Sequence, residues 1–124
     1  MTCPFCKPHA ELFGNALAYV KADEFPVSPG HVLIIPRRHV SSWFDLTKEE
    51  HAAAVDLLIT TKKYLDLEYH PDGYNIGVNC GEAAGQSIMH AHLHVIPRYA
   101  GDVSNPRGGI RAVIHAKQDY PRIK

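Results

Sequence analysis

The chain has 124 residues, of which 45% are hydrophobic and 21% are charged, as in an ordinary globular domain with a core of its own. Thirteen basic residues balance thirteen acidic ones, so we expect no nucleic-acid partner, because dedicated nucleic-acid binders usually carry a basic excess. The sequence has no apolar run as long as a signal peptide or a membrane span, and we therefore expect a cytoplasmic location and no membrane partner.

The N-terminal part of the chain reads as a metal knuckle followed by two strands. Residues 1–15 contain a Cys-x-x-Cys pattern and then predict a short helical turn. Residues 15–21 are typical of a strand, and the two prolines and the glycine of residues 22–30 predict a loop. Residues 31–36 form a β-rich run that ends at a proline, and its continuous apolar content indicates a strand buried on both faces.

A helix and further strands follow. Thr47 and Glu50 fit a capping box, and apolar residues recur at helical spacing beyond them, which predicts a helix over about residues 48–67. The predicted strands of this half, in chain order, cover about residues 74–79, 87–98 and 110–115.

The order of these elements predicts the fold class. One helix set apart from several hairpin-like strands indicates an α+β fold, with an antiparallel sheet of about five strands, one main helix and a short N-terminal helix. We expect a single domain over residues 1–124, with a core of about residues 3–100 and a C-terminal tail of about residues 101–124.

The strand predicted over residues 87–98 carries the strongest signal of function. His90, His92 and His94 alternate with apolar residues, and successive side chains of a strand point to opposite faces. The three imidazoles are therefore expected on one face, about 7 Å apart, while the apolar residues enter a core. Because three imidazoles are costly to bury without partners, the pattern predicts a polar site for a metal, a phosphate or proton transfer.

The loop before the histidines contains small and polar residues. Gly81 and Gly85 allow a backbone path close to a ligand, while Gln86 and Ser87 add side-chain donors, and free N–H groups in such a loop can cradle an anion. By itself this loop is as consistent with a tight turn as with a phosphate site. Together with the histidines it suits phosphoryl chemistry, in which the protein mainly positions groups and stabilises charge.

The cysteines indicate a second site. Cys3 and Cys6 have the spacing of a zinc knuckle, and in a reducing compartment they are expected to form a metal half-site rather than a disulfide. Tetrahedral zinc needs two more ligands, which the histidines can supply. Cys80 is isolated in the sequence and is expected to be a small buried residue.

Residues 79–98 closely resemble the histidine triad (HIT) superfamily in its His-φ-His-φ-His-φ-φ motif, where φ is an apolar residue. The resemblance extends upstream to Ser-Pro-Gly-His-Val-Leu-Ile-Ile-Pro-Arg-Arg-His at residues 28–39 and covers most of residues 3–100. It implies a HIT-like fold and an enzyme, a nucleotide hydrolase or transferase that cleaves at the α-phosphate of dinucleoside polyphosphates or related nucleotidyl conjugates through a covalent nucleotidyl-histidine. Two alternatives stay open on the same fold: a nucleoside phosphoramidate hydrolase and a non-catalytic nucleotide-binding interaction protein.

The resemblance also implies roles for individual residues. His92, the middle histidine, is the expected nucleophile, and His94 is expected to bond a phosphoryl oxygen and help the leaving group depart. The other expected substrate contacts are Gln86 and Ser87 for phosphate, Asn79 for phosphate or ribose, Asp23 for the ribose hydroxyls and His31 beside the same pocket. Apolar residues near Leu12, Phe13 and Leu17 are expected to surround the base.

A zinc site and a homodimer are further implications of the resemblance. The expected zinc ligands are Cys3, Cys6, His39 and His90, and four protein ligands close the coordination shell, so this zinc would be structural. As a zinc ligand, His90 would be unavailable for a proton relay. Any divalent cation at the catalytic centre is expected to arrive with the nucleotide substrate.

Overall fold

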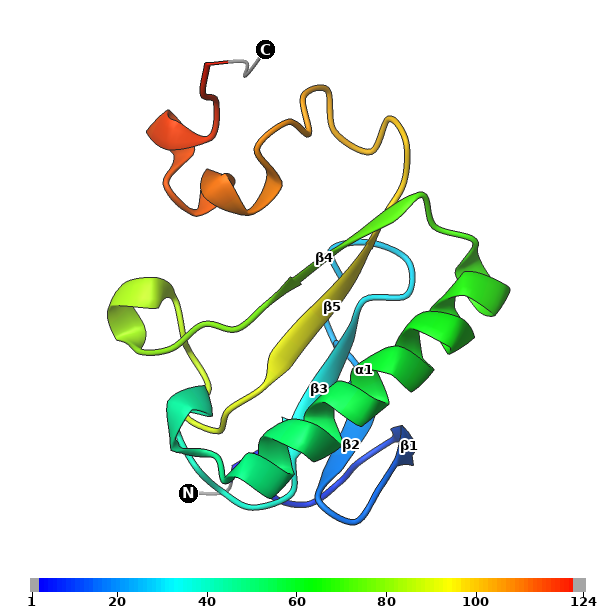
Figure 1. Ribbon diagram of the computed structural model, residues 1–124, viewed down its shortest axis with the longest axis vertical. Helices are drawn as coiled ribbons and strands as arrows, with labels where there is room; N and C mark the ends of the chain where they lie inside the picture. Colours follow the sequence, from blue (N-terminus) through cyan, green and yellow to red (C-terminus); the bar gives the residue numbers. More distant parts are fainter. Residues whose placement is uncertain (1–2, 122–124) are drawn as a thin grey trace.

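The computed structural model describes residues 3–121 of the chain (Figure 1). Its longer elements, in chain order, are β1 (Glu11–Gly14), β2 (Ala18–Ala22), β3 (Val32–Pro36), α1 (Lys48–Tyr69), β4 (Gly73–Gly77) and β5 (Leu93–Arg98). Four short 3-10 helices lie between and after them, namely η1 (Trp43–Asp45), η2 (Glu82–Ala84), η3 (Gly109–Val113) and η4 (His115–Lys117).

The five strands form one sheet in the order β1-β2-β3-β5-β4, and every neighbouring pair is antiparallel. The long helix α1 lies across one face of this sheet (Figure 1). The predicted α+β fold, with about five antiparallel strands and one main helix, is confirmed.

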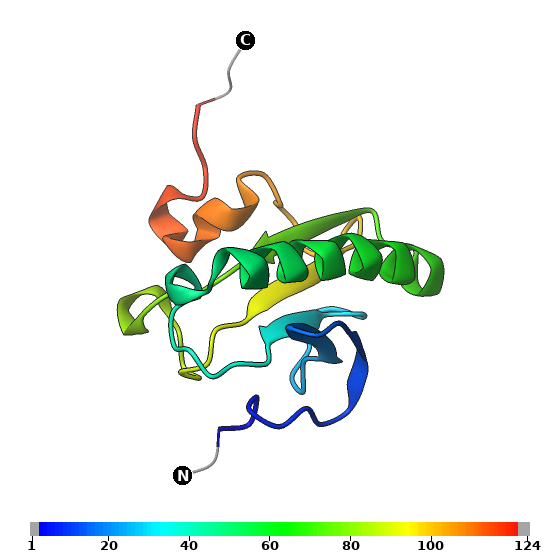
Figure 2. The ribbon, with the colours of Figure 1, turned by 60° about the horizontal axis from the view of Figure 1, so that its bottom comes forward.

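Both faces of the sheet are covered. Alternate strand residues point toward α1 and form the main core, which contains Ala18, Val20, Val32, Ile34 and Val95 against Ala54, Leu57 and Leu65. Tyr19, Leu33 and Ile35 form a second cluster with Phe5 of the N-terminal segment, which crosses the face opposite the helix (Figure 2). All five residues of β3 are buried, as the continuous apolar run predicted.

The face away from α1 also carries a row of side chains that crosses three strands. Lys21 of β2 is the register partner of Leu33 of β3, and Leu33 is the partner of His94 of β5. Directly opposed residues of antiparallel strands project to the same side of a sheet. The three side chains therefore lie on the face that Phe5 partly covers.

The predicted capping box sets the start of α1. The Thr47 hydroxyl accepts a hydrogen bond from the Glu50 amide at 3.1 Å, and the Glu50 carboxylate accepts one from the Thr47 amide at 2.8 Å. The helix runs two residues further than predicted and ends at Tyr69, and the residue that caps it, His70, has a left-handed φ of 50°. No helix within residues 3–121 combines the length and the apolar character needed to cross a membrane.

The structure differs from the prediction at both ends of the chain. Residues 3–10 form turns instead of a short helix, in keeping with the two prolines at positions 4 and 8, and Glu11–Gly14 pairs with β2 as an edge strand. The strand expected over 110–115 is replaced by η3 and η4. Gly108 and Gly109, with φ of 93° and 48°, turn the chain there, and the Arg111 amide donates back to the Gly108 carbonyl at 2.9 Å.

Candidate active site and metal centre

A cavity of about 370 Å³ opens on the sheet face opposite α1. His92 and His94 line it, together with Asn79 and Ser87 from the loop before β5 and Asp23 from the loop after β2. Of the predicted substrate contacts, these five line the cavity. The two others, His31 and Gln86, are only 4% exposed and lie behind the wall.

The hydrogen bonds of His92 identify its free ring nitrogen. Its Nδ1 lies 2.9 Å from the backbone carbonyl oxygen of His90. A carbonyl only accepts, so Nδ1 carries the hydrogen and donates it, and Nε2 keeps an unprotonated lone pair. The side chain is 8% exposed and its ring meets Phe5 and His94 edge to face, each at 5.1 Å between centroids. The free Nε2 of His92 is thus held in one orientation at the cavity.

A chain of hydrogen bonds gives His94 the opposite character. The Val27 amide donates to Nδ1 of His31 at 3.1 Å, so the hydrogen of a neutral His31 must be on Nε2. That Nε2 lies 3.0 Å from Nδ1 of His94, which therefore accepts, leaving the hydrogen of His94 on its own Nε2. His94 is consequently a hydrogen-bond donor at the cavity, next to a His92 that offers a lone pair.

Burial keeps both members of this chain neutral. Desolvation lowers the pKa of His31, although the nearby carboxylate of Asp23 opposes the shift. Desolvation also lowers the pKa of His94, and the neighbouring rings of His92 and His31 add to the effect. Near neutral pH the donor and acceptor assignments derived from the neutral rings therefore apply.

The carboxylate of Asp23 is held at the edge of the cavity. Its Oδ1 accepts from the Phe25 amide at 2.9 Å, and its Oδ2 lies 3.4 Å from Nε2 of His31. A carboxylate has about four lone-pair directions, so Asp23 keeps acceptor capacity toward the cavity. This arrangement suits hydroxyl donors of a ligand.

The loop before β5 is braced from within by Gln86. Its side-chain oxygen accepts from the Gly81 amide at 2.8 Å, while its amide nitrogen donates to the carbonyl oxygens of Ser41 at 2.8 Å and Ile88 at 3.1 Å. These three bonds hold the side chain inside the loop, whereas the exposed Ser87 faces the cavity. Gln86 therefore shapes the loop and Ser87 is the side chain that a ligand meets.

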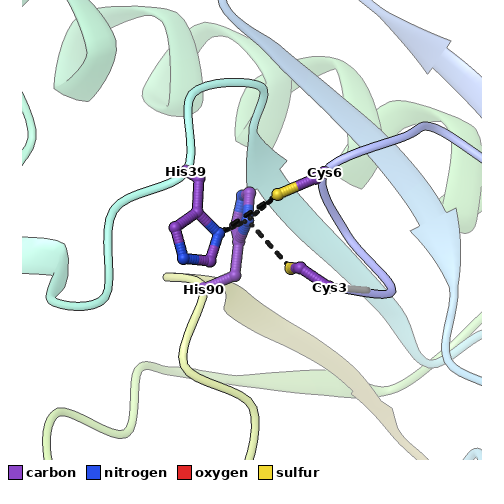
Figure 3. A group of neighbouring side chains, drawn as sticks. All are labelled: Cys3, Cys6, His39 and His90. Carbon is purple, nitrogen blue, oxygen red and sulfur yellow. Dashed lines mark hydrogen bonds between the residues drawn. The ribbon is translucent and has the colours of Figure 1, made fainter. Parts of the chain in front are cut away.

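Four candidate metal ligands converge near the start of β5 (Figure 3). Nδ1 of His90 lies 3.4 Å from Cys3 Sγ, 3.7 Å from Cys6 Sγ and 3.2 Å from Nδ1 of His39. Cys6 Sγ and Nδ1 of His39 are 3.1 Å apart. In a tetrahedron with Zn–S of about 2.3 Å and Zn–N of about 2.0 Å, ligand atoms are roughly 3.3–3.8 Å apart. The four residues fit a zinc ion.

The orientation of His90 agrees with this fit. Its Nε2 lies 2.7 Å from the Pro36 carbonyl oxygen, so it carries the hydrogen and leaves Nδ1 free to bind a metal. β5 begins only at Leu93, and a bend over residues 88–90 precedes it. Of the three predicted histidines, only His92 and His94 line the cavity. His92 directly precedes β5 and His94 lies on it, while Nδ1 of His90 is directed to the cysteines.

The sequence analysis missed part of the cavity wall. Phe5, Leu33 and Lys21 line it, whereas Leu12, Phe13 and Leu17 do not. Phe13 packs instead on Tyr64 of α1, with ring centroids 5.6 Å apart. The period of β2 could have indicated Lys21, because it follows Tyr19 on the face that also holds the histidines.

Comparisons with known proteins agree with this architecture. The model of the family described as "HIT domain" matches residues 7–101. The chain is 36% identical over 110 residues to "AP-4-A phosphorylase" of Mycobacterium tuberculosis, covering 86% of this chain and 56% of that protein. It is 36% identical over 104 residues to "Adenosine 5'-monophosphoramidase hnt1" of Schizosaccharomyces pombe, covering 79% and 75% respectively. The chain thus spans little more than half of the mycobacterial relative.

A solved structure shares the fold. The "ZN-bound histidine triad family protein" from Mycobacterium smegmatis superposes with a TM-score of 0.75 at 31% identity, covering 84% of this chain and 80% of the other. His92 and His94, the second and third histidines of the motif, lie within the matched span, line the cavity and have fixed tautomers. The chain therefore belongs to the HIT family.

Proposed function

We propose that this protein is a nucleotidyl hydrolase or transferase that cleaves dinucleoside polyphosphates, or related nucleotidyl conjugates, at the α-phosphate. The observation that carries the proposal is the pairing at the cavity of a free lone pair on His92 Nε2 with a donor on His94 Nε2. A nucleophile beside a hydrogen-bond donor suits a two-step transfer through a covalent intermediate, because the donor stabilises the charge that develops on oxygen. The name of the mycobacterial relative supports the substrate class.

The proposed reaction follows from these atoms. The lone pair of His92 Nε2 attacks the α-phosphorus, a P–N bond forms, and the P–O bond to the leaving group breaks with its electron pair on the leaving oxygen. The hydrogen on His94 Nε2 bonds a phosphoryl oxygen or the leaving oxygen as charge develops there. Water, or a phosphate acceptor, then displaces His92 from phosphorus and restores its neutral ring.

The surrounding residues position the nucleotide in this proposal. Ser87 and the backbone amides of its loop bind phosphoryl oxygens, Asn79 bonds the phosphate or ribose, and Asp23 accepts from the ribose hydroxyls. Gln86 acts through the loop that it braces, and His31 acts through the tautomer of His94. Any divalent cation is carried in by the polyphosphate, whose charge it shields.

We also propose a structural zinc at Cys3, Cys6, His39 and His90, supported by the ligand spacing and by the zinc-bound relative. When bound, the metal ties the N-terminal segment to the residues just before β5. Three cysteines of the chain are free thiols in the structure, and a reducing, cytoplasmic location would keep the two ligand thiols available.

A homodimer is the assembly that we propose. Among the strands of residues 3–121, β4 pairs only with β5, and Ile76 on it is 43% exposed. Val55 and Ile59 on α1 are 54% and 56% exposed and lie one helical turn apart. Burying these apolar side chains at an interface with a second copy of the chain is favourable. Light scattering of the protein as it elutes from a size-exclusion column would measure the mass of the assembly directly.

The decisive experiment incubates purified protein with diadenosine tetraphosphate or with an adenosine phosphoramidate, and follows AMP release by chromatography beside a His92→Ala control. Release from the tetraphosphate that is lost in the variant is the expected result. If added inorganic phosphate yields ADP in place of AMP, the enzyme is a transferase to phosphate. Cleavage of the phosphoramidate alone would move the protein to the alternative activity, which the yeast relative's name supports. Nucleotide binding without cleavage would establish a binding protein instead.

A further inference from the structure

Lys21 is a buried charged residue at the cavity with no role in the chemistry above. It is 6% exposed, lies at the end of β2 and lines the cavity. Its ammonium nitrogen is 5.8 Å from the centre of the Phe5 ring, and that ring also contacts His92. Lys21 therefore lines the same cavity as His92.

No side chain within residues 3–121 neutralises this ammonium. None of the ion pairs or hydrogen bonds in that part of the chain involves it, although Asp23 and Glu24 line the same cavity. Burying an ammonium without a partner is costly, and its three N–H donors seek acceptors. The cavity contents are the available source of those acceptors.

The position of Lys21 assigns it to one end of the cavity. The register row places it two strands from His94, about 10 Å away, with the apolar side chain of Leu33 between them. The loop before β5, which carries Ser87, leads into the N-terminal end of that strand, where His92 and His94 line the cavity. Lys21 therefore faces the part of a nucleotide farthest from the reacting phosphate.

The walls at this end favour a nucleobase over a phosphate chain. Phe5 and Leu33 offer apolar surface to a flat ring, while the carboxylates of Asp23 and Glu24 would repel added phosphate charge. A Cα separation of about 10 Å between Lys21 and His94 leaves room for a purine beyond the ribose. A purine edge that meets an ammonium must present acceptors to it.

We infer that Lys21 is a base-specificity residue, which selects a purine with a carbonyl at C6, such as guanine or hypoxanthine, over adenine. Guanine presents two acceptors, O6 and N7, on one edge, and a lysine commonly bonds both. Adenine presents an amino group in place of O6, so one donor of Lys21 would face another donor. Sites built to hydrogen-bond a ligand group discriminate strongly against analogues that lack it. This inference rests on the proposed function but concerns only the nucleoside that the site accepts.

Calorimetric titration of the full chain with IMP and AMP tests the inference, because these ligands differ only around C6. We expect IMP to bind about tenfold more tightly than AMP. Lys21→Met should remove this preference by weakening IMP while leaving AMP within about twofold, and Lys21→Arg, which keeps the donors, should restore it. Lys63→Met, an exposed position on α1, is the matched control and should retain the wild-type ratio.

The results that would contradict the role of Lys21 differ from the result that would contradict the proposed function. An equal or AMP-favouring ratio in the wild type, or an unchanged IMP preference in Lys21→Met, would overturn the inference. If Lys21→Met weakened ribose 5-phosphate as much as IMP, the lysine would bind the sugar phosphate and the base assignment would be wrong. Failure of the wild type to bind any nucleotide would instead overturn the proposed function itself. Circular dichroism verifies the fold of each variant, so that a loss of binding is assigned to the side chain.

Discussion

Replacing His31 with phenylalanine tests whether the hydrogen-bond chain behind the cavity matters for activity. Phenylalanine keeps a ring of similar size in a position that is 4% exposed, so packing is largely preserved. It removes the donor that lies 3.0 Å from Nδ1 of His94. Without that donor, the tautomer of His94 that carries its hydrogen on Nδ1 becomes accessible, and this form cannot donate from Nε2 to the substrate.

The expected loss follows from the strength of one neutral hydrogen bond. Such a bond contributes about 0.5–1.5 kcal/mol net, which corresponds to roughly a 2- to 13-fold reduction in kcat/KM. The reduction should appear mainly in kcat, because the donor of His94 acts where charge develops in the transition state. Direct proton transfer by His31 itself would cost far more, since general acid–base catalysis contributes about 100-fold or more.

Initial rates of AMP release from diadenosine tetraphosphate give both constants. His51→Phe is the matched control, because His51 lies on α1 against Trp43 and outside the cavity. It should leave kcat/KM unchanged. An unaltered kcat/KM in the His31 variant would refute the positioning role, and a loss as complete as that of His92→Ala would place His31 in the chemical step.

Three other predictions concern the loop, the metal and the helix cap. Ser87→Ala should lower kcat/KM about tenfold without changing the melting temperature. Gln86→Leu should lower the melting temperature as well, because it removes three hydrogen bonds to backbone groups, and equal melting temperatures of the two variants would contradict this division. Mass spectrometry of the metal content should find one zinc per chain that Cys6→Ser loses and Cys80→Ser keeps, and equal zinc in both would exclude the site. Glu50→Gln should reduce the free energy of unfolding by about 2 kcal/mol near neutral pH, because hydrogen bonds from Arg38 lower the pKa of Glu50 from 4.5 to about 2. A depressed folded-state pKa gives stability that is present above the ordinary pKa and lost as pH falls toward 2, so denaturant titrations of the two proteins should converge in acid.

Local chemistry made much of the fold predictable from the sequence. The capping box at Thr47 and Glu50 fixed the start of α1, and the continuous apolar run of β3 indicated burial on both faces. The terminal elements were not predictable in this way, because β1 exists through its pairing with β2. Long-range pairing of a short edge strand leaves little trace in local periodicity.

The candidate site was only partly accessible to the same reasoning. Alternation along the motif predicted that His92 and His94 share a face, and the structure agrees. It could not show that β5 begins only at Leu93, because the alternating pattern starts earlier, at His90. Nor could it show that the side-chain amide of Gln86 donates to the Ser41 carbonyl, since the partners of an amide are set by tertiary contacts.

The motif histidines are chemically identical, and the backbone groups around them give each a different task. The Pro36 carbonyl fixes the hydrogen of His90 on Nε2 and exposes Nδ1 to the thiols, while the His90 carbonyl fixes that of His92 on Nδ1 and exposes Nε2 to the cavity. For His94 the assignment comes through the ring of His31, which is itself oriented by a backbone amide. Three backbone contacts thus distinguish the proposed metal ligand, the proposed nucleophile and the proposed donor. A sequence that kept the histidines but displaced one of these contacts would retain the motif and lose the division of tasks.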